Sequence, residues 1–226
     1  MKQALTLVVL MVTPSIVSAQ GTVAFGNNSA ELVQQWTSAY DSTPAPVPVG
    51  GGYVQLITAP TGNRLLQPLG IYAGSSGFLP GYSSLAGFLA ANPGWAVPYA
   101  GFLGLAPLAP APIILAPGRF NGGTATIYHI GNGADADYVV IGWTGPYATY
   151  DAAYAADLAN PNSSFLGMSA VATTPTGITQ INPGTPVALN TTFQGITLAP
   201  AVIPEPTTVL LAGLGAVLLL LLRRRG

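Results

Sequence analysis

The chain has 226 residues, of which 50% are hydrophobic and only 6% are charged, and it contains no cysteine. The lack of cysteine excludes disulfides, thiolate metal sites and cysteine nucleophiles. Four of the six basic residues lie close to the two ends, so the body between them keeps only Arg64 and Arg119. Two arginines cannot form the basic patch that replaces counterions on phosphate, which excludes a nucleic acid as partner.

The N-terminal segment has the order of a secretory signal. Lys2 precedes an apolar run from Ala4 to Val12, and small residues follow at Val17-Ser18-Ala19. A basic start, a short apolar run and a small-residue cleavage site are the features that define a signal peptide. The run is only about 14 Å long as a helix, which is too short for a stable membrane span. We therefore expect residues 1–19 to be removed by signal peptidase, between Ala19 and Gln20.

The body, residues 20–200, is predicted to be an all-β domain, a β-sandwich of short strands. Runs rich in β-branched and aromatic residues are short, and Gly, Pro or Asn separates them, which is typical of many strands joined by turns. The first strand is expected around Val23 and Phe25, whose spacing places them on one face. The other expected strands are Tyr53–Thr58, Ile113–Ala116, Thr124–Ile130, Tyr138–Thr144, Phe165–Ala172 and Phe193–Leu198.

Two short helices and two proline-rich segments complete the predicted body. The alanines of Thr149–Leu158 favour a helix that ends before a proline, and Ser83–Ala91 is a second helical pattern. A Pro-, Ala- and Gly-rich insertion near residues 79–120 has prolines at short intervals, which exclude a helix interior or a central strand. We expect this insertion, and the shorter Pro44–Val49, to be extended loops.

The C-terminal segment, residues 201–226, has three parts. Pro204-Glu205-Pro206 comes first, an apolar run follows from Val209 to Leu222, and Arg223, Arg224 and Arg225 come last. The run is about 21 Å long as a helix, shorter than the ~30 Å hydrocarbon core, but it is apolar on all sides and the arginines can reach the headgroups. We expect a helix in membrane lipid, with the arginines cytoplasmic and the body outside. Its anchoring side chains are Val209, Leu210, Leu211, Leu214, Leu218 and Leu222.

The Pro-Glu-Pro segment has two interpretations. Proline suits the first turn of a helix, and a carboxylate is favoured at a helix N-terminus, so the segment can simply begin the membrane helix. Two prolines that flank one residue also hold the chain extended, with little entropy left to lose on binding. The segment would then be a recognition tag that presents the carboxylate of Glu205 just above the bilayer.

Together these three parts resemble a PEP-CTERM sorting signal. The resemblance implies that an exosortase, a membrane protease-transpeptidase of bacteria that make extracellular polymeric material, processes the chain close to Pro204-Glu205-Pro206. The body also resembles PEP-CTERM proteins of Verrucomicrobia-like bacteria, in Gln20-Gly21-Thr22-Val23, Tyr53-Val54-Gln55-Leu56 and Gly142-Trp143-Thr144-Gly145. No activity attaches to these body motifs.

Residue types that carry chemistry are sparse in the body. His129 is the single histidine, and a lone histidine on a strand is more often structural than catalytic. No serine lies in a Gly-x-Ser-x-Gly elbow. The stretch Asn132–Asp137 offers oxygen ligands for calcium, but it lacks the distal glutamate of an EF-hand loop, and its Asn-Gly pair favours a polar hairpin turn instead. We expect no catalytic residue, no cofactor and no metal.

Aromatic side chains are the remaining candidates for binding. A sugar-stacking surface or an ordinary core could use Trp36, Tyr40, Trp95, Tyr99, Trp143, Tyr147, Tyr150 and Tyr154. The sequence favours a non-enzymatic surface or extracellular-matrix protein, exported and held at the membrane. The alternatives are an extracellular carbohydrate-binding module and a secreted hydrolase. The expected partners are membrane lipid, signal peptidase, an exosortase and, for the body, extracellular polysaccharide.

Overall fold

The computed structural model describes residues 20–38, 41–63, 84–101, 106–160, 162–177 and 185–200. The predicted signal peptide, residues 1–19, and the predicted membrane helix, Val209–Leu222, lie outside the described residues. Within the described ranges, no helix is both long enough and apolar enough to cross a membrane.

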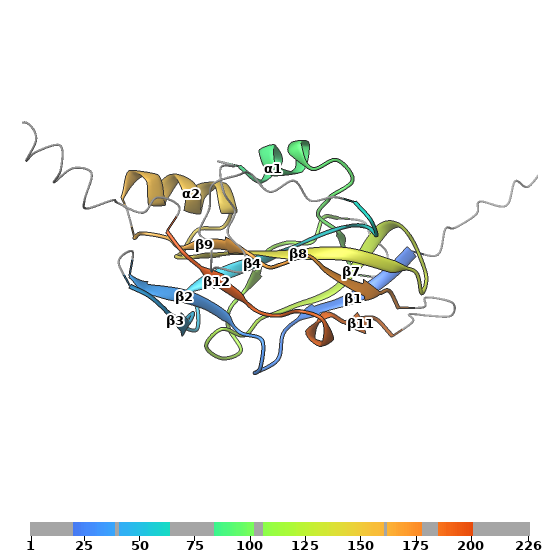
Figure 1. Ribbon diagram of the computed structural model, residues 1–226, viewed down its shortest axis with the longest axis horizontal. Helices are drawn as coiled ribbons and strands as arrows, with labels where there is room; N and C mark the ends of the chain where they lie inside the picture. Colours follow the sequence, from blue (N-terminus) through green and yellow to red (C-terminus); the bar gives the residue numbers. More distant parts are fainter. Residues whose placement is uncertain are drawn as a thin grey trace, which may run out of the picture.

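The described body is mostly β-structure, arranged in three sheets (Figure 1). The first sheet has the strand order β11 (Val187–Ala188), β1 (Gln20–Gly26), β7 (Asn121–Gly131) and β5 (Tyr99–Ala100). The second has the order β10 (Ala172–Pro175), β8 (Asp135–Thr144), β4 (Gly52–Pro60) and β6 (Ala111–Pro112), and β9 (Leu166–Met168) also pairs with β8. The third has the order β12 (Ile196–Leu198), β2 (Val33–Ser38) and β3 (Asp41–Pro46).

The first and second sheets share one hydrophobic core. Val23 and Phe25 of β1 are both buried in it, as their predicted common face requires. Leu56 of β4 and Val140 of β8 belong to the same cluster, as do Ile196 and Leu198 of β12. The predicted all-β class is therefore confirmed as a mostly β body with several packed sheets.

A second core lies on the opposite face of β4 and β8, beneath two helices. Ile57 and Ile141, the neighbours of Leu56 and Val140 along their strands, point into it, because successive side chains alternate across a strand. Both helices cover the same side of the second sheet (Figure 1). They contribute Phe88 from α1 (Leu85–Ala91) and Tyr150 and Ala153 from α2 (Tyr150–Ala159). The strands β4 and β8 are thus buried on both faces.

The two helices begin where their sequences predict. Ser84 precedes α1, and its hydroxyl accepts a hydrogen bond from the backbone N–H of Gly87 at 3.1 Å. Thr149 caps α2 in the same way through the N–H of Ala152 at 3.3 Å. Each cap satisfies one of the backbone donors that have no partner inside the helix.

Three expectations for the proline-rich segments differ, wholly or in part, from the structure. Pro44 and Pro46 belong to the strand β3, which lies at the edge of the third sheet, where a missing N–H costs no ladder hydrogen bond. The predicted strand Ile113–Ala116 is instead a loop beyond β6, in which Ile114 and Leu115 are more than half exposed. The insertion near residues 79–120 is also more ordered than a single extended loop, because its described parts contain α1, β5 and β6.

Candidate functional site

The last described residues define the point where the chain leaves the body toward its C-terminal segment. Strand β12 runs parallel to β2, with Ile196 opposite Val33 and Leu198 opposite Gln35. Just beyond it, Ala199 and Leu166 exchange two backbone hydrogen bonds of 2.7 and 2.9 Å. Ala199 and the following Pro200 are both buried. The body therefore holds the chain firmly as far as Pro200.

A glycine on the neighbouring sheet makes room for β12. A Cβ atom at Gly142 of β8 would lie 2.6 Å from Cδ1 of Ile196 and 3.0 Å from Cδ2 of Leu198. Both distances are shorter than ordinary van der Waals contact, so the two β12 side chains pack directly against the backbone of β8. This close packing and the Ala199–Leu166 pair together attach the end of the body to the second sheet.

The N-terminal end of the body is equally well ordered. Gln20, the residue expected to follow the signal cleavage site, is the first residue of β1 and lies opposite Gly131 of β7. The next residue, Gly21, packs against Thr176, because a Cβ atom there would lie 2.3 Å from the Thr176 hydroxyl oxygen. The start of β1 and the end of β12 lie toward opposite ends of the long axis (Figure 1).

Most of the predicted functional residues cannot be placed by the structure. The sorting residues Pro204, Glu205 and Pro206, the anchoring side chains from Val209 to Leu222, the basic cluster Arg223–Arg225 and the cleavage-site residue Ala19 all lie outside the described residues. Gln20 is the one predicted site residue that the described ranges include. Sequence reasoning did not identify the packing roles of Gly142 and Ala199, because these roles depend on contacts between strands that are distant in the sequence.

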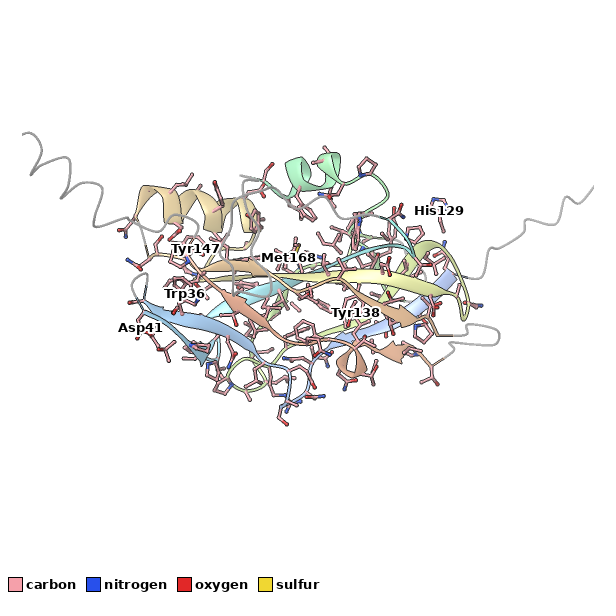
Figure 2. All side chains as sticks on the ribbon, in the orientation of Figure 1. Trp36, Asp41, His129, Tyr138, Tyr147 and Met168 are labelled. Carbon is pink, nitrogen blue, oxygen red and sulfur yellow. The ribbon has the colours of Figure 1, made fainter. Side chains whose placement is uncertain are left out.

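His129 lies in a bulge of β7. Gly21 pairs with Ile127 and Gln20 with Gly131, so the intervening residues of β7 have no counterpart on β1. The bulge lets both Ile127 and Ile130 enter the core, and it places His129 in a left-handed conformation, with a φ of 61°. Its exposed side chain lies at the periphery of the body, far from the labelled Asp41 (Figure 2).

His129 borders a pocket of about 320 Å³. The pocket lies between the end of β4, the segment before β5 and the bulge of β7, and its walls are mainly apolar. Its polar side chains are Thr58, Tyr99 and His129. The bulge buries Ile127 and Ile130, and as a result it places His129 beside the pocket.

The Asn132–Asp137 stretch forms a turn, but it does not close the predicted hairpin. Gly133 has a φ of 74°, which suits glycine, and the turn leads from β7 in the first sheet to β8 in the second. The carboxylate of Asp137 accepts hydrogen bonds from the Thr173 hydroxyl at 2.6 Å and the Gly62 N–H at 3.0 Å. It thereby joins β8 to β10 and to the turn after β4. Among the described residues, no three His, Asp or Glu side chains gather as a metal site would require.

The aromatic residues mainly build the core. Trp143 is 1% exposed and donates its indole N–H to the Tyr147 carbonyl at 2.8 Å. Tyr53 stacks on it at a centroid distance of 6.1 Å, and Tyr150 meets it edge-on at 6.4 Å. Burial raises the pKa of Tyr150, because the phenolate would be poorly solvated there. Trp36 and Trp95 are also buried, Tyr99, Tyr147 and Tyr154 are partly exposed, and Tyr40 lies outside the described residues.

A comparison with known families identifies the class of signal at the C-terminus. The chain carries a protein-sorting motif immediately after the described body. It is the PEP-CTERM protein-sorting motif, whose family model matches residues 202–225. This motif implies an exported, membrane-associated protein that an exosortase processes. No curated protein and no solved structure matches the chain. The resemblance of the body to Verrucomicrobia-like proteins stays a prediction.

Proposed function

We propose that this chain is an exported, non-enzymatic surface or extracellular-matrix protein, whose folded body is delivered by exosortase processing at its C-terminus. The observation that supports this proposal most directly is the position of the sorting motif. The match begins at residue 202, and the last described residue of the body is the buried Pro200. A folded domain that leads directly into a sorting signal has the organisation expected of an exported domain whose destination the signal determines.

The acidic side chains of the body support a structural role, because several of them hold elements together. Asp151 in α2 accepts a hydrogen bond of 2.7 Å from the N–H of Leu85 and so links the two helices. The buried Asp157 accepts one of 3.0 Å from the N–H of Asn162, just beyond the end of α2. Asp137 joins three segments, as described above. Because these carboxylates accept hydrogen bonds from backbone N–H groups within the fold, they favour a structural protein over a hydrolase.

The proposed topology has the body outside the cytoplasm. Signal peptidase removes residues 1–19, the helix from Val209 to Leu222 spans the lipid, and Arg223–Arg225 remain cytoplasmic. Exosortase processing then determines whether the body stays at the surface or enters the matrix, where extracellular polysaccharide is the proposed partner. The burial of Trp36, Trp95, Trp143 and Tyr150 removes much of the stacking surface that a carbohydrate-binding module would need.

The test separates a sorting tag from a simple helix start. Glu205→Gln removes the carboxylate of the tag, and a second variant replaces Pro204 and Pro206 by alanine and so releases the extended backbone. We expect the precursor of both variants to persist in the membrane of a host that has the exosortase, while the wild-type precursor is processed. The measurement is a pulse-chase of the three chains. Equal precursor lifetimes in all three would refute sorting and leave an ordinary membrane anchor.

A further inference from the structure

The distance between the folded body and the sorting tag is very short. Three residues lie between Pro200 and Pro204, so the Cα atoms of these two prolines can be at most about 14 Å apart, even in a fully extended chain. A body of this length has a radius of gyration of about 16 Å. On the other side of the tag, two residues lie between Pro206 and Val209, where the expected membrane helix begins. In the proposed topology, little chain is therefore available on either side of the tag.

A membrane protease must enclose the chain on both sides of the bond that it cleaves. An active-site cleft that takes an extended peptide needs several free residues, and a body that is folded as far as Pro200 leaves few of them on the N-terminal side of the tag. The described residues nearest the tag are held by the body, because Ala199 is paired with Leu166 and Pro200 is buried. More chain becomes available only if the end of the body opens.

Strand β12 is the element that can open. It has three residues, lies at the edge of the third sheet and is the last strand of the described body. Releasing Ile196–Pro200 would lengthen the free chain by about 17 Å and would leave the pairing of β2 with β3 in place. Terminal elements open at a lower cost than the whole domain unfolds. The burial of Ile196 and Leu198 keeps the opened state rare.

We infer that β12 is a latch that controls the access of the exosortase to the sorting tag. This inference rests on the proposed function and adds its regulation: processing proceeds from the molecules in which β12 has detached from β2 and β9. The rate of processing then depends on how stably β12 docks. A longer tether, meaning a longer stretch of chain between Pro200 and Pro204, would let the enzyme reach the tag without the detachment of β12.

The experiment lengthens the tether and weakens the latch, separately and together. An eight-residue Gly-Ser spacer is inserted between Pro200 and Ala201, and Leu198→Ala removes a fully buried side chain of β12. Leu158→Ala is the matched control, because Leu158 is 50% exposed on α2. The full chain is followed by pulse-chase in a host with the exosortase.

We expect the spacer and Leu198→Ala each to shorten the precursor lifetime several-fold, and Leu158→Ala to leave it unchanged. The doubly altered chain should behave like the spacer chain alone, since a long tether bypasses the latch. The spacer replaces no residue of the folded body, so it tests the inference even if Leu198→Ala fails to fold. An unchanged or longer lifetime of the spacer chain overturns the latch. If the wild-type chain and Glu205→Gln share one lifetime, the proposed function itself fails.

Discussion

Gly21→Ala is expected to destabilise the body strongly, although it adds only one methyl group. The new Cβ would lie 2.3 to 2.6 Å from three side-chain atoms of Thr176, including its Cβ, so rotation of the threonine cannot relieve the clash. The Thr176 hydroxyl also donates toward the carbonyls of Gly131 and Ala134, at 3.0 and 2.9 Å. Overpacking costs about 1–3 kcal/mol, and losing this bonding adds about 1 kcal/mol. The expected loss in the free energy of unfolding is therefore about 2–4 kcal/mol.

Gly131→Ala provides the matched control for this prediction. Gly131 lies on β7 at the same end of the strand pair, opposite Gln20, and a Cβ atom there has no neighbour within 4 Å. Urea unfolding of the full-length chain in mild detergent can be followed by tryptophan fluorescence, because Trp95 and Trp143 are buried. We expect a clearly lower midpoint for Gly21→Ala and a nearly unchanged one for Gly131→Ala.

A double-mutant cycle identifies the cause. If the clash with Thr176 is responsible, Thr176→Ala should lessen the effect of Gly21→Ala, so that the two changes together cost less than their sum. Midpoints that are equal for Gly21→Ala and Gly131→Ala would refute the reasoning. So would strict additivity of Gly21→Ala and Thr176→Ala.

Two further predictions concern the ends of the chain. The exported protein should begin at Gln20, as intact mass spectrometry of the outer fraction would show, and a chain that retains Met1 there would contradict signal cleavage. Replacing both Leu214 and Leu218 by arginine should cost several kcal/mol of insertion, since each central arginine costs about 2.5–3.5 kcal/mol. Such a chain should no longer fractionate as an integral membrane protein, and continued integral behaviour would disprove the span at Val209–Leu222.

The features that the sequence predicted correctly are local ones. The helix α2 follows from its alanines and α1 from a short helical pattern, and the structure adds a hydroxyl cap to each, at Ser84 and Thr149. The strands β4, β7 and β8 follow from runs of β-branched and aromatic residues between turn residues. The sorting motif was recognisable because its three parts are contiguous, and the family comparison finds it at residues 202–225. In each case, the residues that carry the prediction lie close together in the sequence.

The features that depend on tertiary structure could not be read in this way. The Asn132-Gly133 turn is present, yet it joins two different sheets, because β7 pairs with β1 and β8 pairs with β4. Pro44 and Pro46 occupy a strand because β3 finds an edge position, which no local pattern specifies. The division of the aromatic residues between core and surface likewise depends on which sheet faces lie beneath the helices.

The sequence by itself therefore determined the sorting motif, the β class of the body and the short elements that local propensity controls, while the signal peptide stays a prediction. Only the tertiary structure decided that β12 docks against β2 and β8, that Gly142 makes room for it, and that the body is held as far as Pro200. The physical reason is that strand partners are chosen by burial and shape between segments far apart in the chain. Residue spacing along one segment carries no information about the segment that will cover it.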